Sequence, residues 1–432
     1  MPLRPDVLKH RRPPCREGLC IRTDGLPEAH RRLIEAAKLL EREHGDVQDV
    51  EFTVEATTTA AAPPPKPRTY DWPLYGLTPS RIRAFQEPKS PAPPFRQQWQ
   101  VSGEVLLEFP PALEGDTLYQ LNDGGMLRAF DKRTGKVRWR HKLGSLAAST
   151  PAVGGGVVYV TILERSKGAN GRAVALRTRD GKILWSKDLG SRSESSPLLY
   201  DGKLAFGTEG GTVYALSART GKTLWTYQAA GAVKGGPALA NGNLYFGDYG
   251  GQVQAVRAQT GKRVWSTGTN GGSFGRSGTF YSTAALRFGR VYLGNTDGRM
   301  YSFAQRDGEL AWATRTGNYV YAAPVVADVP GLGPTAFAGS YDGSFYAFDA
   351  QSGSVRWSYN AGGRISGGGT LVGNVVYFAE LGNRRTIGLD ARTGKKVFTF
   401  PKGGFDPVIT DGRWLFLTGY TSLHALVPVR QP

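Results

Sequence analysis

One motif recurs along most of this chain and restricts its fold more than any other feature. It places a glycine turn and a tryptophan at fixed distances after an alanine, most often as Ala-x-x-x-x-Thr/Asp-Gly-Lys-x-x-Trp. Successive copies end 40 to 47 residues apart, a period typical of propeller blades. The copies are Ala129–Trp139, Ala175–Trp185, Ala215–Trp225, Ala255–Trp265 and Ala347–Trp357, with weaker ones at Ser302–Trp312 and Gly388–Phe398.

Each unit reads as four short strands. In residues 236–265, an inner strand begins at Pro237 and a tight turn follows at Asn241-Gly242. A second strand, an alternating third strand and an outer strand that ends at Trp265 complete the unit. Asn-Gly, Asp-Gly and Gly-Gly pairs between alternating runs predict hairpins, because such turns need positive φ. Four antiparallel strands per unit predict a propeller blade.

The two ends of the repeat region predict how the ring closes. Trp99 lies 40 residues before Trp139, in register with the repeat, yet it has no blade of its own. The last unit, near Ser422, stops without its tryptophan strand. We therefore expect an all-β, eight-bladed propeller of four-stranded antiparallel blades, closed by an N-terminal strand that leaves no unpaired edge. A seven-bladed ring with an additional strand is the alternative.

The first 94 residues differ in composition from the repeats. Residues 1–55 predict an extension with one helix at about 27–44, where Pro27 suits the first turn and Gly45 the end. Residues 56–94 are rich in Thr and Pro and predict an extended linker. The propeller is expected over residues 95–430. Both cysteines, Cys15 and Cys20, precede it, so its body offers no disulfide or cysteine metal site.

These repeats resemble the pyrroloquinoline-quinone (PQQ)-like propeller repeats of quinoprotein dehydrogenases and of an outer-membrane-assembly lipoprotein. The resemblance covers about three-quarters of the chain and implies that each tryptophan stacks on the glycine turn of the next blade. A flat ring over a turn without a side chain is also physically reasonable. The docking residues expected on this basis are Trp99, Trp139, Trp185, Trp225, Trp265, Trp312 and Trp357, with Phe398 as a substitute.

Charge points to one face of the predicted ring. The chain carries a formal net charge of +18, which favours anionic partners (nucleic acid, an anionic polymer such as that of a cell wall, or an anionic membrane surface) or serves solubility alone. The turn of the motif places lysines at equivalent points of one rim, either for binding or because the turn tolerates them. This predicted basic rim consists of Lys136, Lys182, Lys222, Lys262 and Lys395.

The opposite face collects the loops that enter the inner strands. Two connections are long, residues 163–172 and 266–281, and loops on rigid scaffolds often carry function. We expect a channel mouth of mixed charge and aromatic rings that suits an anionic or aromatic small ligand; an ordinary solvated funnel is the alternative. Its predicted residues are Arg192, Glu194, Lys234, Arg276, Tyr281, Tyr319, Tyr321 and Arg364.

Catalytic motifs are weak. The five histidines have no metal-ligand spacing, and Gly271-Gly-Ser273-Phe-Gly275 lacks the helix that a nucleophile elbow needs. The family resemblance makes a PQQ- and calcium-dependent dehydrogenase of alcohols or sugars the enzymatic alternative. Such enzymes hold their metal with carboxylates and amides and use an Asp base. Glu194, Glu380 and Asp406 are the acids that could serve.

We therefore expect a monomeric, non-catalytic binding or assembly scaffold without a cofactor, its partner a protein or an anionic polymer. The resemblance implies an extracellular or cell-envelope location, with residues 56–94 as a stalk. No signal peptide and no apolar run of about 20 residues are evident. Either the protein is cytoplasmic or its natural start lies upstream.

Overall fold

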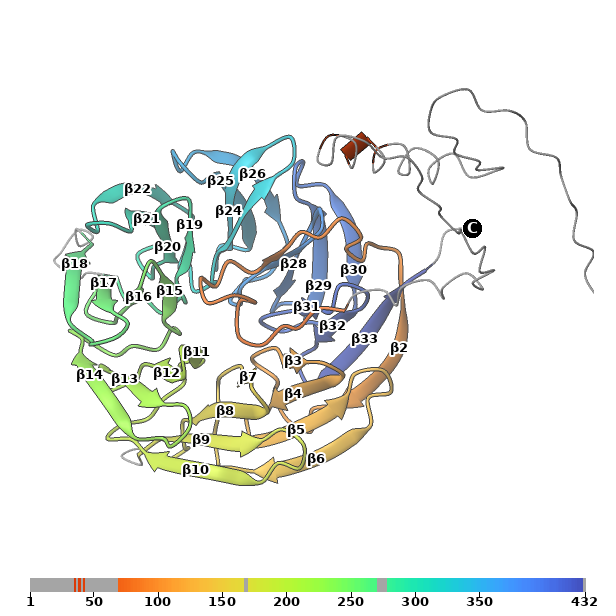
Figure 1. The fold of residues 1–432 in the computed structure, drawn as a ribbon. Helices are drawn as coiled ribbons and strands as arrows, with labels where there is room; N and C mark the ends of the chain where they lie inside the picture. Colours follow the sequence, from red (N-terminus) through yellow and green to blue (C-terminus); the bar gives the residue numbers. More distant parts are fainter. Residues whose placement is uncertain are drawn as a thin grey trace, which may run out of the picture. The chain divides into compact units, whose positions relative to one another are not determined.

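The computed structural model describes residues 35, 38, 39, 42, 69–166, 170–269 and 278–429. Eight sheets stand radially around a common centre (Figure 1). The predicted eight-bladed propeller is therefore confirmed, and the seven-bladed alternative is wrong. We number the blades in chain order, with the innermost strand of each named first.

Blades 1 to 4 have the same four-strand order. Blade 1 comprises β3 (Ala112–Glu114), β4 (Thr117–Leu121), β5 (Met126–Asp131) and β6 (Val137–Lys142). Blade 2 comprises β7 (Ala152–Gly154), β8 (Val157–Ile162), β9 (Arg172–Arg177) and β10 (Ile183–Asp188). Blade 3 comprises β11 (Leu198–Tyr200), β12 (Lys203–Phe206), β13 (Thr212–Ser217) and β14 (Thr223–Gln228). Blade 4 comprises β15 (Ala238–Ala240), β16 (Asn243–Gly247), β17 (Gln252–Arg257) and β18 (Arg263–Gly268).

Blades 5 to 7 continue this order, and blade 7 gains a fifth strand, β1 (Ala84–Phe85), parallel to β27. Blade 5 comprises β19 (Ala285–Arg287), β20 (Arg290–Gly294), β21 (Arg299–Ala304) and β22 (Leu310–Arg315). Blade 6 comprises β23 (Val325–Val329), β24 (Gly333–Gly339), β25 (Ser344–Asp349) and β26 (Val355–Asn360). Blade 7 comprises β27 (Thr370–Val372), β28 (Val375–Glu380), β29 (Arg385–Asp390) and β30 (Lys396–Phe400).

Blade 8 joins the two ends of the propeller. It comprises β31 (Val408–Thr410), β32 (Leu415–Thr418), β33 (Ser422–Pro428) and, as its outer strand, β2 (Phe95–Ser102). Trp99 pairs with Ala425 in this antiparallel contact. The predicted closure by an N-terminal strand is thus confirmed.

The motif's alanine and tryptophan face each other in the outer strand pair. Trp225 pairs with Ala215, and a bulge follows immediately, since Leu216 pairs with Thr223. The same pairing places Ala, Ser or Gly opposite the aromatic residue in every blade. A small residue at this position leaves room for the large ring beside it.

Each of the seven tryptophan rings lies against the glycine of the next blade's turn. A Cβ added to Gly221 would lie 2.8 Å from the Trp185 ring, and the Trp185 indole donates a 2.9 Å hydrogen bond to the Ala218 carbonyl oxygen. The glycines are Gly135, Gly181, Gly221, Gly261, Gly308, Gly353 and Gly394. Phe398 differs, because blade 8 has no such turn; its ring meets Phe95 instead, 5.6 Å between centroids.

The hydrophobic core lies between neighbouring blades. One cluster joins Tyr119 and Leu121 of blade 1 to Val158 and Val160 of blade 2. Other clusters bridge blades 4 and 5, and blades 6 and 7. Burial between sheets holds the ring together, as in other propellers.

The described N-terminal residues differ from the predicted organisation. The compact unit that contains the propeller begins at Arg68, whereas the sequence suggested a linker over 56–94 and a boundary near residue 95. Residues 70–85, which we call the strap, are buried or half-buried except for Asp71 and Pro79. The prolines of this segment made it resemble a linker, yet a proline carbonyl still accepts hydrogen bonds.

The strap runs across the centre of the ring (Figure 1, orange), and its hydrogen bonds reach all eight blades. Backbone hydrogen bonds join it to seven of them, in most cases at the second residue of the inner strand. Arg81 reaches blade 3 through the Ser196 carbonyl oxygen. The inner-strand amides that donate to strap carbonyls are those of Leu113, Val153, Leu239, Leu286, Val326 and Leu371.

Other N-terminal predictions fall largely outside the described residues. Of the predicted helix at 27–44, Glu35, Lys38, Leu39 and Arg42 are described, and all four are helical. Cys15, Cys20 and Arg276 lie outside the described part of the chain. Within that part, we find no helix that is long and apolar enough to cross a membrane.

Candidate functional site: the central pocket

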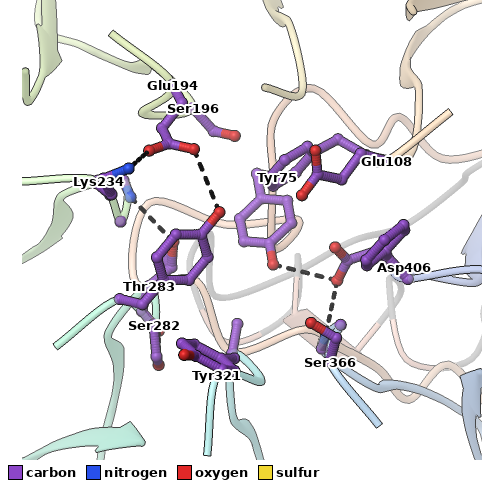
Figure 2. A pocket seen from close by; sticks show the side chains of 18 residues that line it. Tyr75, Glu108, Glu194, Ser196, Lys234, Ser282, Thr283, Tyr321, Ser366 and Asp406 are labelled. Carbon is purple, nitrogen blue, oxygen red and sulfur yellow. Dashed lines mark hydrogen bonds and ion pairs between the residues drawn. The ribbon is translucent and has the colours of Figure 1, made fainter. Parts of the chain in front are cut away.

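The loops that enter the inner strands converge on a pocket at the propeller axis. In six blades the residue four positions before the inner strand lines this pocket. The strap forms its floor, because Tyr75 lies between the loops and faces the pocket (Figure 2). The six residues are Glu108, Glu194, Lys234, Tyr281, Tyr321 and Ser366.

Tyr75, Arg83 and Asp406 form a buried group at the floor. The Tyr75 hydroxyl donates to Asp406 Oδ1 at 3.1 Å, and Arg83 Nη2 lies 2.8 Å from the same oxygen. The Gly368 amide also donates to it, at 2.8 Å. Burial raises the pKa of Asp406, an effect that Arg83 partly offsets. Burial likewise raises the pKa of Tyr75, so this phenol stays protonated.

Two strap arginines have positive φ and fully buried side chains. Arg81 and Arg83 have φ values of 57° and 56°. Arg81 donates to the carbonyl oxygens of Tyr75, Ser196 and Pro237 at 2.7 to 2.9 Å. Burial lowers the pKa of Arg81 to about 9. Carbonyl contacts from two blades and the strap itself hold this segment in place.

A second charged group lies on the opposite wall of the pocket. Lys234 forms an ion pair with Glu194 and another, at 3.1 Å, with Glu209. Burial lowers the pKa of Lys234, but the Glu194 and Glu209 carboxylates outweigh burial and raise it. The Tyr281 hydroxyl donates to Glu194 at 3.3 Å. Arg192 stands farther out, 3.5 Å from Glu209.

Glu108 lies beside Tyr75 and Asp406, across the pocket from Lys234 (Figure 2). It makes no hydrogen bond or ion pair with any residue that the structure describes. Burial, followed by the nearby charges of Glu194, Asp406 and Asp123, raises the pKa of Glu108 to about 7. This carboxyl group therefore changes charge near neutral pH.

The structure brings together part of the predicted channel mouth. Glu194, Lys234, Tyr281 and Tyr321 line the pocket. Arg192, Tyr319 and Arg364 lie outside the set that lines it. The sequence interpretation missed Tyr75, within the presumed linker, and Glu108. The repeat register could have found Glu108, which precedes its inner strand by the same four residues as Glu194 and Lys234. Asp406, nominated only as an acid, also lines the pocket.

Two observations bear on whether this pocket could hold a quinone with a calcium ion. Among the described residues, no three His, Cys, Asp or Glu side chains are grouped so as to hold a metal. The cavity measures about 40 Å³, room for roughly three waters. Glu380, the third nominated acid, lies outside the pocket and pairs with Arg385 at 3.0 Å.

Exposed and half-buried aromatic and arginine side chains continue from the pocket over blades 5 to 8. Arg364 lies over the Tyr341 ring at 5.8 Å and Arg384 over the Tyr420 ring at 3.9 Å. The Leu381 amide donates to the Arg364 carbonyl oxygen, so the two groups adjoin. We call this set the aromatic patch: Tyr319, Tyr341, Arg364, Arg384 and Tyr420.

The five predicted rim lysines are all exposed and lie in the turns between the third and outer strands. In antiparallel blades these turns share a face with the first hairpins, away from the pocket. Blades 5 and 6 carry Glu309 and Ser354 at the equivalent position. The rim lysines therefore lie on blades 1 to 4 and blade 7, so they do not form a complete ring around this face.

Comparison with known proteins agrees with this architecture. Residues 92–227 and 304–410, more than half of the chain, match a family model described as outer membrane protein assembly factor BamB. No curated protein sequence matches the chain.

Solved structures show the same fold at low identity. BamB from Moraxella catarrhalis is 17% identical with a TM-score of 0.62, covering 79% of this chain and 99% of that one. Quinohemoprotein alcohol dehydrogenase from Comamonas testosteroni is 17% identical with a TM-score of 0.68, covering 85% and 82%. A europium-containing methanol dehydrogenase is 14% identical with a TM-score of 0.68, covering 83% and 98%.

Proposed function

Because this chain belongs to the family of the outer membrane protein assembly factor BamB, we propose that it is a non-catalytic scaffold that binds another protein through loops on a rigid propeller. The family description, an assembly factor, supports a protein partner. It also supports a location in the cell envelope. We propose that the scaffold acts as a monomer.

The strap is the observation that carries this proposal. It hydrogen bonds to the inner strands around the ring and leaves a pocket of about 40 Å³. Two of the three acids that line it already have partners: Asp406 pairs with Arg83, and Glu194 with Lys234. Little space is left for a large cofactor, which supports function on the outer surface.

The aromatic patch is the surface that we assign to the partner. Tyrosine and arginine are enriched in protein interfaces and in the residues that dominate binding energy. Tyr319 is 46% exposed, and its ring packs edge-on against Tyr321, 5.7 Å between centroids. Aromatic neighbours hold these side chains in place, so binding costs less conformational entropy.

Adding the quinone tests the proposal against its enzymatic rival. The purified protein is mixed with PQQ and Ca²⁺, dialysed, and examined for retained quinone absorbance and dye-linked oxidation of alcohols and sugars. We expect neither signal. Stoichiometric quinone after dialysis, with sustained turnover, would contradict the scaffold function and favour a dehydrogenase.

The basic rim supports a second candidate function, adhesion to an anionic cell-wall polymer or to nucleic acid. Its lysines are exposed on four consecutive blades. Such binding would weaken steeply with salt, because it releases counterions. Changing Lys136, Lys182 and Lys222 together to Gln should reduce both the affinity and its salt dependence in a DNA-binding titration. Equal affinity of the variant would remove this candidate.

A further inference from the structure

The charges that line the central pocket are mostly negative. Carboxylates of Glu108, Glu194 and Asp406 line it, against one cation, Lys234. Lys234 is already paired with Glu194 and Glu209. Arg81 and Arg83 lie in the strap and are absent from the pocket lining. The pocket thus disfavours the anionic ligand that the sequence suggested.

Two carboxylates have unused capacity to accept hydrogen bonds. All the hydrogen bonds to Asp406 from described residues converge on its Oδ1, which leaves Oδ2 without one, although the residue is only 3% exposed. Glu108 has no partner among the described residues. Both line the same cavity on the same side of Tyr75 (Figure 2). Glu108 is half-buried and pairs with no cation of the described residues, so a bound cation would offset part of the cost of its ionisation in the pocket.

Aromatic rings complete the lining. Tyr75, Tyr281 and Tyr321 surround the space next to these acids. The faces of such rings attract organic cations. A metal ion would need several grouped acidic or imidazole ligands, and no such group of three exists among the described residues. The lining therefore suits an organic cation better than a metal.

We propose that the central pocket binds a small primary ammonium group, held by the Glu108 and Asp406 carboxylates against tyrosine rings. This site goes beyond the scaffold function and does not depend on it. The cavity volume of about 40 Å³ admits an ammonium head with a short carbon chain. A quaternary ammonium has no N–H to donate to these carboxylates, so it should bind more weakly.

The site also predicts how binding varies with pH. The charged groups around Glu108 are Glu194, Asp406 and Asp123, which disfavour its ionisation, and Lys234, which favours it. Glu108 attracts the cation only when its carboxyl group is ionised. Since its pKa is about 7, affinity should be higher at pH 8 than at pH 5.5.

Methylammonium is the probe, and saturation-transfer difference NMR on its methyl protons measures binding to the whole chain. Tetramethylammonium, sodium acetate and Ca²⁺ serve as comparison ligands at equal ionic strength. We expect methylammonium to bind more tightly than all three. No methylammonium signal, equal binding of tetramethylammonium, or displacement by acetate or Ca²⁺ would overturn the proposal.

The variant Glu108→Gln identifies the site. It should weaken methylammonium binding roughly tenfold at pH 8, because a charge-assisted contact is lost, and should abolish the difference between pH 8 and pH 5.5. Glu309→Gln, an exposed acid on the opposite face, is the matched control and should bind as the natural chain does. Unchanged binding by Glu108→Gln would overturn the assignment. The pH dependence of the unmodified protein provides the same test without a variant.

Discussion

At the scale of single residues, the repeat motif is explained by one contact between blades. The tryptophan ring covers the next blade's glycine, and the alanine lies opposite the tryptophan in the outer strand pair. Glycine is required at Gly221 for two reasons: the backbone has φ +70°, and the Trp185 ring leaves no space for a Cβ. Two glycines of blade 3 allow the effects of the backbone conformation and of the missing space to be measured separately.

Gly221→Ala should lower the free energy of unfolding by more than Gly202→Ala. Gly202 has φ +69° with no atom within 4 Å of an added Cβ, whereas a Cβ at Gly221 would lie 2.8 Å from Trp185. Gly202→Ala therefore loses only the conformational preference, about 1 kcal/mol. In Gly221→Ala the added methyl group also overpacks against Trp185, which should lower the free energy of unfolding by roughly 1 to 3 kcal/mol more. Urea denaturation measures both; equal losses would contradict the docking role of Trp185.

His424 should make blade 8 sensitive to acid. It contacts Gln97 of the N-terminal strand at 2.9 Å, and burial, aided by Lys402, lowers its pKa to about 4. Between pH 6.5 and 4 the unfolded chain binds this proton more readily. Stability therefore falls as pH decreases through that window, by about 1.4 kcal/mol per pH unit from this residue.

The raised pKa of Glu108 acts in the opposite direction, because the folded chain retains that proton up to about pH 7. Denaturation curves should therefore be compared in a Glu108→Gln background, with and without His424→Gln. We expect the loss of stability between pH 6.5 and 4 to shrink when His424 is replaced. An unchanged pH dependence would show that His424 is not buried in its neutral form.

At the scale of elements, the strap distinguishes this propeller from a bare ring. The sequence predicted the blades well, because hairpin turns and strand alternation are local signals. It did not predict the strap, because residues 70–85 have no repeat and their contacts lie up to several hundred positions away. Pro73 and Pro79 lie within the predicted linker, yet their carbonyl oxygens accept hydrogen bonds from the Val153 and Leu239 amides.

Arg83 should be important for the stability of the strap. Arg83→Met would leave Asp406 buried without its cation, at a cost of roughly 3 to 5 kcal/mol. Arg306→Met is a suitable control, since the Arg306 side chain is 88% exposed and, among the described residues, forms an ion pair with its neighbour Asp307; it should change stability little. Urea denaturation at pH 8 compares the two. Equal stability of both variants would contradict a structural role for the Arg83–Asp406 pair.

At the scale of the whole molecule, the ring places two different surfaces on opposite faces. One face holds the pocket and the aromatic patch, and the other holds the rim lysines. The repeat register predicted which loops share a face, and four of the eight predicted channel residues line the pocket. The repeat register could not predict the depth of the pocket, because the strap, which is not part of the repeat, forms the floor of the pocket.

The aromatic patch should be the site of partner contact. A photo-crosslinking amino acid at Tyr319 should give one discrete protein adduct in the native host, whereas the same group at Leu224, 50% exposed on the outer edge of blade 3, should give none. Tyr319→Ala combined with Arg364→Ala should then weaken that partner's binding by at least about 2 kcal/mol, as for other interface hot spots. Equal adducts at both positions would contradict this surface assignment.

Amide hydrogen exchange of the strap tests the central claim most directly. The amides of Trp72, Leu77, Arg81 and Arg83 are hydrogen bonded, and the strap's carbonyls cover inner-strand amides such as those of Leu239 and Leu286. We predict that a peptide covering residues 71–85 exchanges as slowly as the inner strands themselves. Exchange of that peptide within seconds, as in an unstructured linker, would contradict a channel closed by its own strap.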